Sequence, residues 1–161
     1  MKRLFPVLAL AGLLVVAGCA PAEPPAPVGS EKSRAELQRV DFFGAEAAAD
    51  PAVTWRPSGL GVKIIAPGEG LTPQPADRIR VNYSGRLKDG TVFNATAPGK
   101  PVEFKLGEMI PGMTTGIAAL KPGGRAELYI PPSLGYGSSR VGKIPPVSGL
   151  IFEVELIAVS P

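Results

Sequence analysis

The chain contains no histidine, and its single cysteine, Cys19, lies close to the N-terminus. Histidine is the commonest metal ligand and general base in proteins, and a cysteine thiolate is a common nucleophile. Metal ligation and catalysis through either residue are therefore largely excluded, and we expect no metal and no cofactor. No cluster of lysine and arginine is interleaved with aromatic residues, which argues against nucleic acid as a partner.

The first 18 residues predict an export signal. Met1-Lys2-Arg3 is basic, residues 4–16 form an apolar run, and small residues precede Cys19. The run is about a dozen residues long, whereas a transmembrane helix needs roughly 20. The sequence VAGC at 16–19 resembles the bacterial lipobox, in which the cysteine is lipidated with fatty acids such as palmitate and becomes the N-terminus. A plain signal peptide with an accidental cysteine is the alternative.

The lipobox resemblance implies a location. A lipidated Cys19 would anchor the protein in the cell envelope, and Ala20 directs such lipoproteins to the periplasmic side of the outer membrane when the cell has one. In other cells the anchor would lie in the outer face of the cell membrane. Cleavage before Cys19 removes Lys2 and Arg3 from the 17 basic residues, which leaves 15 against 14 acidic ones. The net charge therefore says little about partners.

Composition divides the chain into four segments. Residues 1–18 are the predicted signal peptide, 19–30 a lipidated cysteine and Pro/Ala-rich tether, 31–53 a short helical lead-in and 54–161 one folded domain. Ser33 and Glu36 match a capping box ahead of apolar residues at helical spacing, which predicts an amphipathic helix that ends before Asp50-Pro51. This helix either packs on the domain or serves as a dimerising arm, so the sequence leaves monomer and dimer open.

Beyond Trp55, apolar residues alternate with polar ones over several short runs, which is typical of strands with one buried face. The inward positions are Ile79, Val81 and Tyr83; Val102, Phe104 and Leu106; Ala126, Leu128 and Ile130; and Leu150, Phe152, Val154 and Leu156. At the outward positions we expect polar residues, together with Tyr129 and two isoleucines of the last run. Asp89-Gly90 predicts a tight hairpin turn, and Pro111 opens a helix that residues 121–124 end. The predicted fold class is α+β, an antiparallel sheet against one short helix.

Five blocks of sequence carry a resemblance. They are VNYSGRLKDGTVFN (81–94), KLGEMIPGM (105–113), GGRAELYIPPSLGYG (123–137), IPP (144–146) and LIFEVEL (150–156). With this order and spacing, from about residue 58 to residue 159, the chain resembles the FKBP-type peptidyl-prolyl cis-trans isomerases. The resemblance implies a curved antiparallel sheet wrapped around the helix, and an enzyme that rotates X-Pro bonds in an apolar pocket. It implies unfolded or partly folded exported proteins as partners, and macrolides as inhibitors.

The resemblance also implies a set of site residues. The catalytic positions are Tyr83, Phe93, Asn94, Tyr136 and Phe152, and the substrate-binding positions are Val102, Met109, Ile110, Met113 and Ile144. Tyr136 matches a family tyrosine whose hydroxyl donates a hydrogen bond to a ligand carbonyl. Read without the family, Phe93, Ile110 and Phe152 would be ordinary core residues. A phenol such as that of Tyr83 or Tyr136 is less easily placed in a core, because it needs a hydrogen-bond partner when buried.

Three positions depart from the family pattern. Asn94 stands in place of the usual aspartate, Met113 in place of the most frequent tryptophan, and Val102 in place of a frequent aromatic residue. An amide carries no charge to polarise a substrate, and methionine makes a more deformable pocket floor. The first hypothesis is a prolyl isomerase that assists the folding of exported proteins. The alternatives are a chaperone or binding module of low turnover for Pro-containing segments, and an envelope lipoprotein whose domain is a scaffold.

Overall fold

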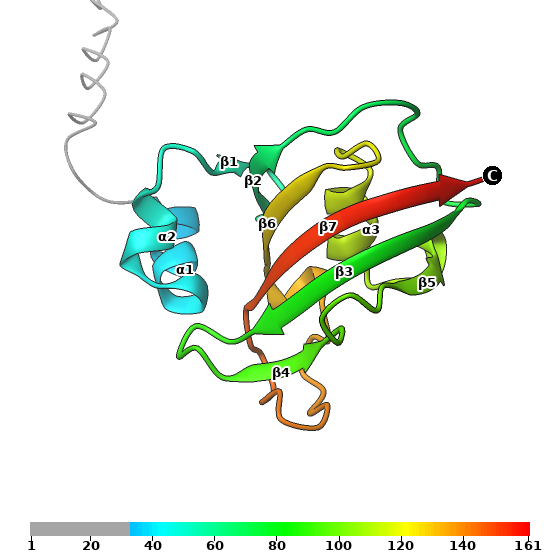
Figure 1. The fold of residues 1–161 in the computed structure, drawn as a ribbon. Coiled ribbons are helices and arrows are strands. Elements are labelled where there is room, and N and C mark those ends of the chain that lie inside the picture. Colours follow the sequence, from blue (N-terminus) through cyan, green and yellow to red (C-terminus); the bar gives the residue numbers. More distant parts are fainter. Residues whose placement is uncertain (1–32) are drawn as a thin grey trace, which may run out of the picture. The chain divides into compact units, whose positions relative to one another are not determined.

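An antiparallel sheet of seven strands is the framework of the computed structural model (Figure 1). The structure describes residues 33–161, so the predicted signal peptide, Cys19 and the tether lie outside the described residues. The strands are β1 (Thr54–Trp55), β2 (Gly61–Ala66), β3 (Arg78–Arg86), β4 (Val92–Ala95), β5 (Val102–Lys105), β6 (Arg125–Ile130) and β7 (Leu150–Ser160). Their order across the sheet is β1-β2-β6-β7-β3-β4, and β5 pairs with the first half of β3. This confirms the predicted antiparallel α+β fold.

The helices of the described chain are short. They are α1 (Arg34–Phe43), α2 (Ala45–Ala49), α3 (Pro111–Ile117) and two 3-10 turns, η1 (Leu106–Glu108) and η2 (Pro132–Leu134). Proline stands in the first turn of α3, as the sequence predicts. The helix ends a few residues before the predicted stop, because tighter turns after Ile117 carry Leu120 into the core, where it is fully buried. Within residues 33–161, no helix combines the length and the apolar character that crossing a bilayer requires.

The main core lies between α3 and the inward face of the sheet. The strand residues that the alternation places inward contribute most of it, among them Ile79, Val81, Leu128, Leu156 and Phe152. The predicted hairpin is present, since β3 and β4 are antiparallel neighbours and Gly90 has a φ of 85° in the connection. Its loop runs from Leu87 to Thr91, whose backbone groups are hydrogen bonded, so it is longer than a two-residue turn.

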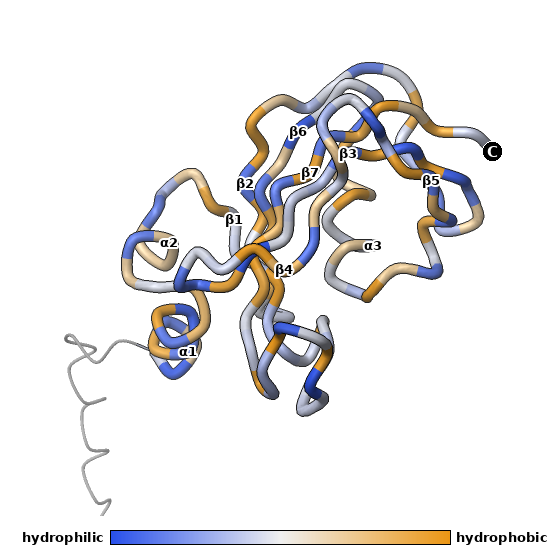
Figure 2. The backbone as a smooth tube through the Cα atoms, turned by 60° about the horizontal axis from the view of Figure 1, so that its bottom comes forward, coloured by the Kyte–Doolittle hydropathy of each residue, from blue (hydrophilic) through white to orange (hydrophobic). Residues whose placement is uncertain are grey.

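The N-terminal helices cover the opposite face of the sheet, as Figure 2 shows for α1 and α3 on either side of β6 and β7. The predicted capping box is present: the Glu36 amide donates to Ser33 Oγ at 3.3 Å and the Ser33 amide to Glu36 Oε2 at 2.9 Å. The predicted single helix is wrong in one respect, because the chain breaks at Gly44, which has a φ of 89°, and resumes as α2. Both helices end before Asp50.

The α1 helix buries residues that the alternation predicts to face water. Tyr129 and Ile151 lie opposite each other on β6 and β7, and they are only 4% and 2% exposed. Phe43 covers them, with ring centroids 5.6 Å from Tyr129 and 5.6 Å from Trp55. A Cβ on Gly149 would stand 2.6 Å from the Cβ of Phe42, so the glycine permits this approach. The expectation of a solvated outer face is therefore wrong at this end of the sheet.

Polar side chains hold the same end of the sheet. Lys63 Nζ donates to Asp50 Oδ2 at 2.7 Å, which ties the segment after α2 to β2. This hydrogen bond is the main cause that lowers the pKa of Asp50 and raises that of Lys63. Tyr129 Oη donates to Glu127 Oε2 at 2.8 Å, while burial of the phenol raises the pKa of Tyr129. The lead-in helices are thus fixed to the sheet by aromatic packing and by the contact between Asp50 and Lys63.

Candidate active site

A cavity of about 350 Å³ opens between the inward face of the sheet and α3. We call it the aromatic cavity, and its lining residues are Tyr83, Phe93, Asn94, Phe104, Glu108, Met109, Ile110, Met113, Tyr136 and Phe152. They come from β3, β4, β5, η1, the start of α3, the loop after η2 and β7. Residues far apart in the sequence therefore meet because the strands carry them to one end of the sheet.

The walls of the aromatic cavity are phenyl and phenol rings in contact. The Phe93 and Phe152 rings meet edge to face, with centroids 5.4 Å apart and planes at 81°. Tyr83 lies 6.1 Å from Phe152 and 6.2 Å from Phe104 between ring centroids. Such edge-to-face pairs add stability beyond the area they bury. The rings form an apolar surface against which a small apolar group can pack.

A β-bulge and a glycine place Phe93 over its neighbour. The pairing of β3 with β4 shifts between Gly85–Asn94 and Arg86–Val92, which leaves Phe93 as the extra residue. Bulges of this kind redirect a side chain next to a functional site. A Cβ on Gly85 would stand 2.6 Å from the Phe152 ring and 2.7 Å from the Phe93 ring. Only glycine therefore lets both rings close over β3.

The floor is held by η1 and α3. Met113 is 2% exposed and reaches the cavity from the first turns of the helix. Thr114 Oγ donates to the Leu106 carbonyl at 2.9 Å, which fastens the helix to the 3-10 turn before it. Ile110 is the N-cap residue, and the fixed φ of the proline after it directs the chain into the helix. The floor is apolar and contains a flexible thioether.

The polar groups at the aromatic cavity are few. Burial is the main cause that raises the pKa of Tyr83, and the phenol of Tyr136 raises this pKa further. The side-chain amide of Asn94 acts in the opposite direction and lowers it. Tyr83 is therefore a neutral hydroxyl donor at neutral pH. The backbone amide of Tyr83 donates to Thr96 Oγ1 at 3.2 Å, which anchors the chain after β4. Among the described residues that line the cavity, Glu108 alone is charged, and its side chain is exposed.

Most of the predicted site residues meet at this cavity. All of the predicted catalytic positions line it, together with Met109, Ile110 and Met113. Val102 and Ile144 lie outside this set: Val102 packs against the core from β5, and Ile144 is 4% exposed within the core. Phe104 and Glu108 line the cavity although sequence reasoning did not assign them to the site. The inward position of Phe104 in its strand was a usable signal, whereas the exposed Glu108 offered none.

The chemistry available at the aromatic cavity is binding rather than proton transfer. Its surface removes a bound group from water, and its nearby hydroxyls are neutral donors that can meet a carbonyl oxygen. A group bound here is held by aromatic faces and one or two hydrogen bonds. Such a site can favour one conformation of a flexible ligand over another without making or breaking a covalent bond.

Comparisons with known proteins identify the family of the chain. Residues 70–157 match the family model described as FKBP-type peptidyl-prolyl cis-trans isomerase. A solved peptidyl-prolyl cis-trans isomerase from Pseudomonas syringae pv. tomato is 34% identical, with a TM-score of 0.69. That alignment covers 82% of this chain and 98% of the other. The fold and the sequence thus point to the same family.

Two curated relatives extend the comparison. A probable FKBP-type peptidyl-prolyl cis-trans isomerase of Haemophilus influenzae is 41% identical over 142 residues, which are 83% of this chain and 59% of the relative. The outer membrane protein MIP of Legionella longbeachae is 37% identical over 132 residues, which are 81% of this chain and 57% of that protein. The chain therefore spans less than two thirds of the length of either. On the family model, these identities and the matching fold, the chain belongs to the FKBP-type peptidyl-prolyl cis-trans isomerase family.

Proposed function

We propose that this chain accelerates the cis-trans rotation of X-Pro peptide bonds in polypeptides, with the aromatic cavity as its active site. The observation that carries the proposal is the meeting of Tyr83, Phe93, Tyr136 and Phe152 around one apolar cavity. A prolyl ring is compact and apolar, and it can pack against the faces of the aromatic rings that line the cavity. The family match supports the same activity.

The physical task of such an enzyme is to stabilise a twisted amide. Rotation about an X-Pro bond has a barrier of about 20 kcal/mol and takes tens of seconds unaided, because the C–N bond is partly double. In our proposal the prolyl ring packs against the wall formed by Phe93 and Phe152, and the Tyr136 hydroxyl donates to a substrate carbonyl. An interaction that is stronger in the twisted amide than in the planar one lowers the barrier. No covalent bond is broken, so a histidine or cysteine is not needed.

Asn94 sets the electrostatics of the proposed site. Its amide lines the aromatic cavity together with the Tyr83 phenol and brings no negative charge into it. A carboxylate at the same place would hold Tyr83 through a stronger, charge-assisted hydrogen bond. We therefore propose that Asn94 preserves the geometry of the site and lowers its turnover relative to an aspartate.

The location and clients form a second part of the proposal. We infer that Cys19 is lipidated and that the domain acts on exported proteins as they fold at the cell envelope. The basic start, the apolar run and the VAGC sequence support an exported lipoprotein, and one relative is an outer membrane protein. Cell fractionation of Cys19→Ser tests this part: we expect release from membranes, and continued attachment of the variant would overturn it.

A second candidate function is a chaperone that binds Pro-containing segments with little turnover. Its support is the neutral Asn94 and the flexible Met113 at the floor of the cavity. Both features leave the apolar walls intact while weakening the orientation of a substrate amide. The two functions differ in whether bound X-Pro segments rotate faster than they do in water.

The deciding experiment is protease-coupled isomerisation of a short X-Pro peptide. The protein is residues 19–161 carrying Cys19→Ser, and the variants are Tyr136→Phe and Tyr129→Phe. Each removes one hydroxyl, but Tyr136 lines the aromatic cavity and Tyr129 lies under α1. We expect a rate well above the spontaneous one, lowered by Tyr136→Phe and unchanged by Tyr129→Phe. A folded protein that gives no acceleration would leave the chaperone as the function.

A further inference from the structure

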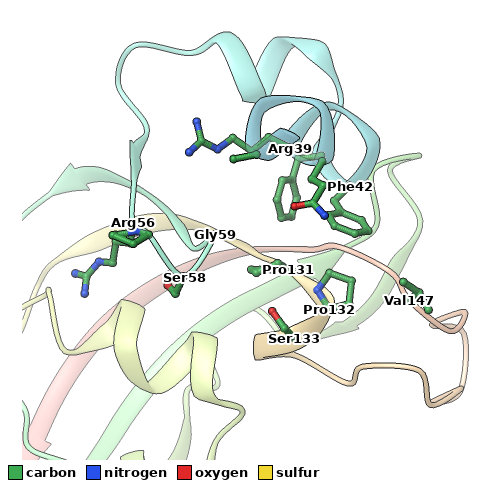
Figure 3. Close-up of a pocket in the computed structure, with 13 residues that line it drawn as sticks. Arg39, Phe42, Arg56, Ser58, Gly59, Pro131, Pro132, Ser133 and Val147 are labelled. Carbon is green, nitrogen blue, oxygen red and sulfur yellow. The ribbon is translucent and has the colours of Figure 1, made fainter. Parts of the chain in front are cut away.

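A second cavity, of about 400 Å³, lies between α1 and two loops of the domain (Figure 3). We call it the α1 cavity. The loop after β1 contributes Arg56, Pro57, Ser58 and Gly59, the turn after β6 contributes Pro131, Pro132 and Ser133, and α1 contributes Ala35, Gln38, Arg39, Phe42 and Phe43, with Val147 at the far edge. It shares no lining residue with the aromatic cavity. A space of this size is unusual between packed elements, which normally fill such gaps with side chains.

The α1 cavity has two chemically different ends. In Figure 3, Arg39 and Arg56 lie toward one side, and Phe42, Pro132 and Val147 lie toward the other. The charged residues on its lining are both arginines, one from α1 and one from the loop after β1. Pro131 and Pro132 form an apolar wall that is itself buried. An occupant that complements both ends carries a negative group beside an apolar one.

The arginines are available to an anionic partner. Within residues 33–161, neither Arg39 nor Arg56 takes part in an ion pair. The Arg39 guanidinium carbon lies 4.7 Å from the centre of the Trp55 ring, a cation–π contact that holds the side chain in place. Its Nε is buried and has no hydrogen-bond partner among the residues that the structure describes. A carboxylate can accept strong, charge-assisted hydrogen bonds from such a guanidinium.

The α1 cavity continues beyond its apolar end. Phe42 and Val147 also line a neighbouring cavity of about 250 Å³, whose lining contains Leu87 and Pro145 together with the charged Asp41, Lys88 and Asp89. The two carboxylates disfavour an acidic group there, so the acidic residue of an occupant belongs at the arginine end. The two spaces share these side chains and follow one side of α1. A simple ion would occupy only the arginine end. An occupant that reaches both spaces must be longer than an ion, as a peptide segment is.

Val147 is a strained residue at the point where the two spaces meet. Its φ is 55°, the left-handed region that a β-branched side chain rarely adopts, and its side chain is 56% exposed. A hydrogen bond from its amide to the Gly137 carbonyl, 2.9 Å long, holds this conformation. Backbone strain of this kind is concentrated at binding and functional sites. Here it presents an isopropyl group to the groove.

We propose that the α1 cavity binds an extended segment of a partner polypeptide that carries an aspartate or glutamate close to a leucine-like residue. The acidic side chain pairs with Arg56 and Arg39, and the apolar side chain packs against Phe42 and Val147. Charge complementarity and the two-ended lining select this occupant. The site is separate from the aromatic cavity, so the proposal stands or falls independently of prolyl isomerisation.

The test is titration of residues 19–161 carrying Cys19→Ser with the proline-free peptide acetyl-Gly-Asp-Glu-Ala-Leu-Leu-Gly-amide. Trp55 is the single tryptophan of the chain and contacts Arg39, so its fluorescence reports binding without a label. Amide NMR shifts locate the peptide. We expect shifts at Arg56, Gly59 and Ser133, and none at Asn94. The matched peptide with Asn and Gln in place of Asp and Glu is expected to bind about tenfold more weakly.

Two pairs of variants sharpen the test. Arg56→Gln is expected to weaken the Kd about tenfold, while Arg80→Gln, which removes an exposed arginine on β3, leaves it unchanged. Val147→Asn relieves the backbone strain, since asparagine tolerates a positive φ. We therefore expect this change to raise Tm and to weaken peptide binding together.

Several outcomes would overturn the proposal. They are no binding, shifts centred on the aromatic cavity, equal affinity for the acidic and amide peptides, and equal affinity of the native protein and Arg56→Gln. An unchanged affinity of Val147→Asn would remove the apolar end from the site. Binding that appears only after residues 19–32 are deleted would assign the groove to the chain's own N-terminal segment instead. Isomerase activity is measured separately and does not enter any of these readings.

Discussion

The aromatic cavity and the α1 cavity lie on one small domain but are built in opposite ways. The walls of the aromatic cavity come largely from strands of one sheet, with Phe93 turned by a bulge and the rings packed on each other. The α1 cavity is formed where a separate helix rests on two loops, and its edge contains the strained Val147. The first is rigid and apolar with neutral donors, and the second is cationic at one end. The comparison teaches that paired strands fix the geometry of the aromatic cavity, while the geometry of the α1 cavity depends on how one helix docks.

The two cavities differ in how easily their residues can be repositioned. Sheet residues cannot shift without moving paired strands, so the spacing of Tyr83, Phe93 and Phe152 is determined by register. A helix that docks through a few aromatic side chains can be repositioned by changing those side chains alone. The predictions below separate these two kinds of construction.

Removing the aromatic anchor of α1 is expected to have the largest effect on stability. Phe43 is 5% exposed and contacts Trp55 and Tyr129. Truncation of a buried phenylalanine costs roughly 3–5 kcal/mol, so Phe43→Ala should lower the free energy of unfolding by about that amount. Urea denaturation monitored by circular dichroism measures it. At urea concentrations below the unfolding transition, Phe43→Ala should keep its isomerase activity. If activity is lost when α1 no longer docks, the two regions are coupled.

Opening the wall of the aromatic cavity is expected to have the largest effect on turnover. Phe93 is partly exposed and packs on Phe152, so Phe93→Ala removes one face of the proposed prolyl site. Loss of about 1.4 kcal/mol of transition-state stabilisation is a tenfold fall in kcat/KM, and we expect at least that. The matched change Phe42→Ala, in the α1 cavity, should leave kcat/KM unchanged. Equal kcat/KM in the native protein and Phe93→Ala would place the reaction elsewhere.

A charge at position 94 is expected to change turnover more modestly. Asn94→Asp puts a carboxylate in place of a neutral amide on the lining that Tyr83 shares, and charge-assisted hydrogen bonds are about twice as strong as neutral ones. We expect kcat/KM to rise a few-fold, with peptide binding in the α1 cavity unaltered. Kinetics at several pH values check the cause. The gain should disappear as the new carboxyl is protonated at low pH, and a pH-independent gain would point to repacking instead.

The smallest predicted effect concerns the ion pair that ties the segment after α2 to the sheet. The pKa of Asp50 is lowered from 3.8, so its contribution to stability is present above that value and is lost as pH falls through the folded-state pKa. The pKa of Lys63 is raised from 10.5, so the contribution is lost again as pH rises through its folded-state value. Asp50→Asn should therefore lower Tm slightly between about pH 5 and 9 and not near pH 2. The same Tm difference at both acid and neutral pH would contradict the ion pair.

Much of the aromatic cavity could be predicted from the sequence, because period-two alternation indicates which residues face inward. Phe104 illustrates this: the pattern placed it inward, but it stands one residue before the motif that begins at Lys105 and was not assigned to the site. Glu108 is different, since an exposed carboxylate in a 3-10 turn leaves no mark in the pattern. Ile144 shows the reverse case, in which a residue of a matching motif turns into the core.

The docking of α1 could be predicted only in part. The capping box of Ser33 and Glu36 predicts where the helix begins, and Gly44 explains where it breaks. Its partner surface was present in the sequence as Tyr129 and Ile151, two large side chains at outward positions. Alternation alone counts such residues as exposed, because it contains no information about a helix from elsewhere in the chain. An outward apolar pair on adjacent strands is thus a usable signal of a covering element.

The most direct test of the central claim is exchange NMR on a short X-Pro peptide with a sub-stoichiometric amount of the protein. Spontaneous rotation takes tens of seconds, so exchange peaks between the cis and trans forms within a one-second mixing period require catalysis. The account predicts such peaks with the native protein and with Tyr129→Phe, and weaker peaks with Tyr136→Phe and Phe93→Ala. Peptide signals that shift on binding without any exchange peaks, at a domain that remains folded, would contradict it.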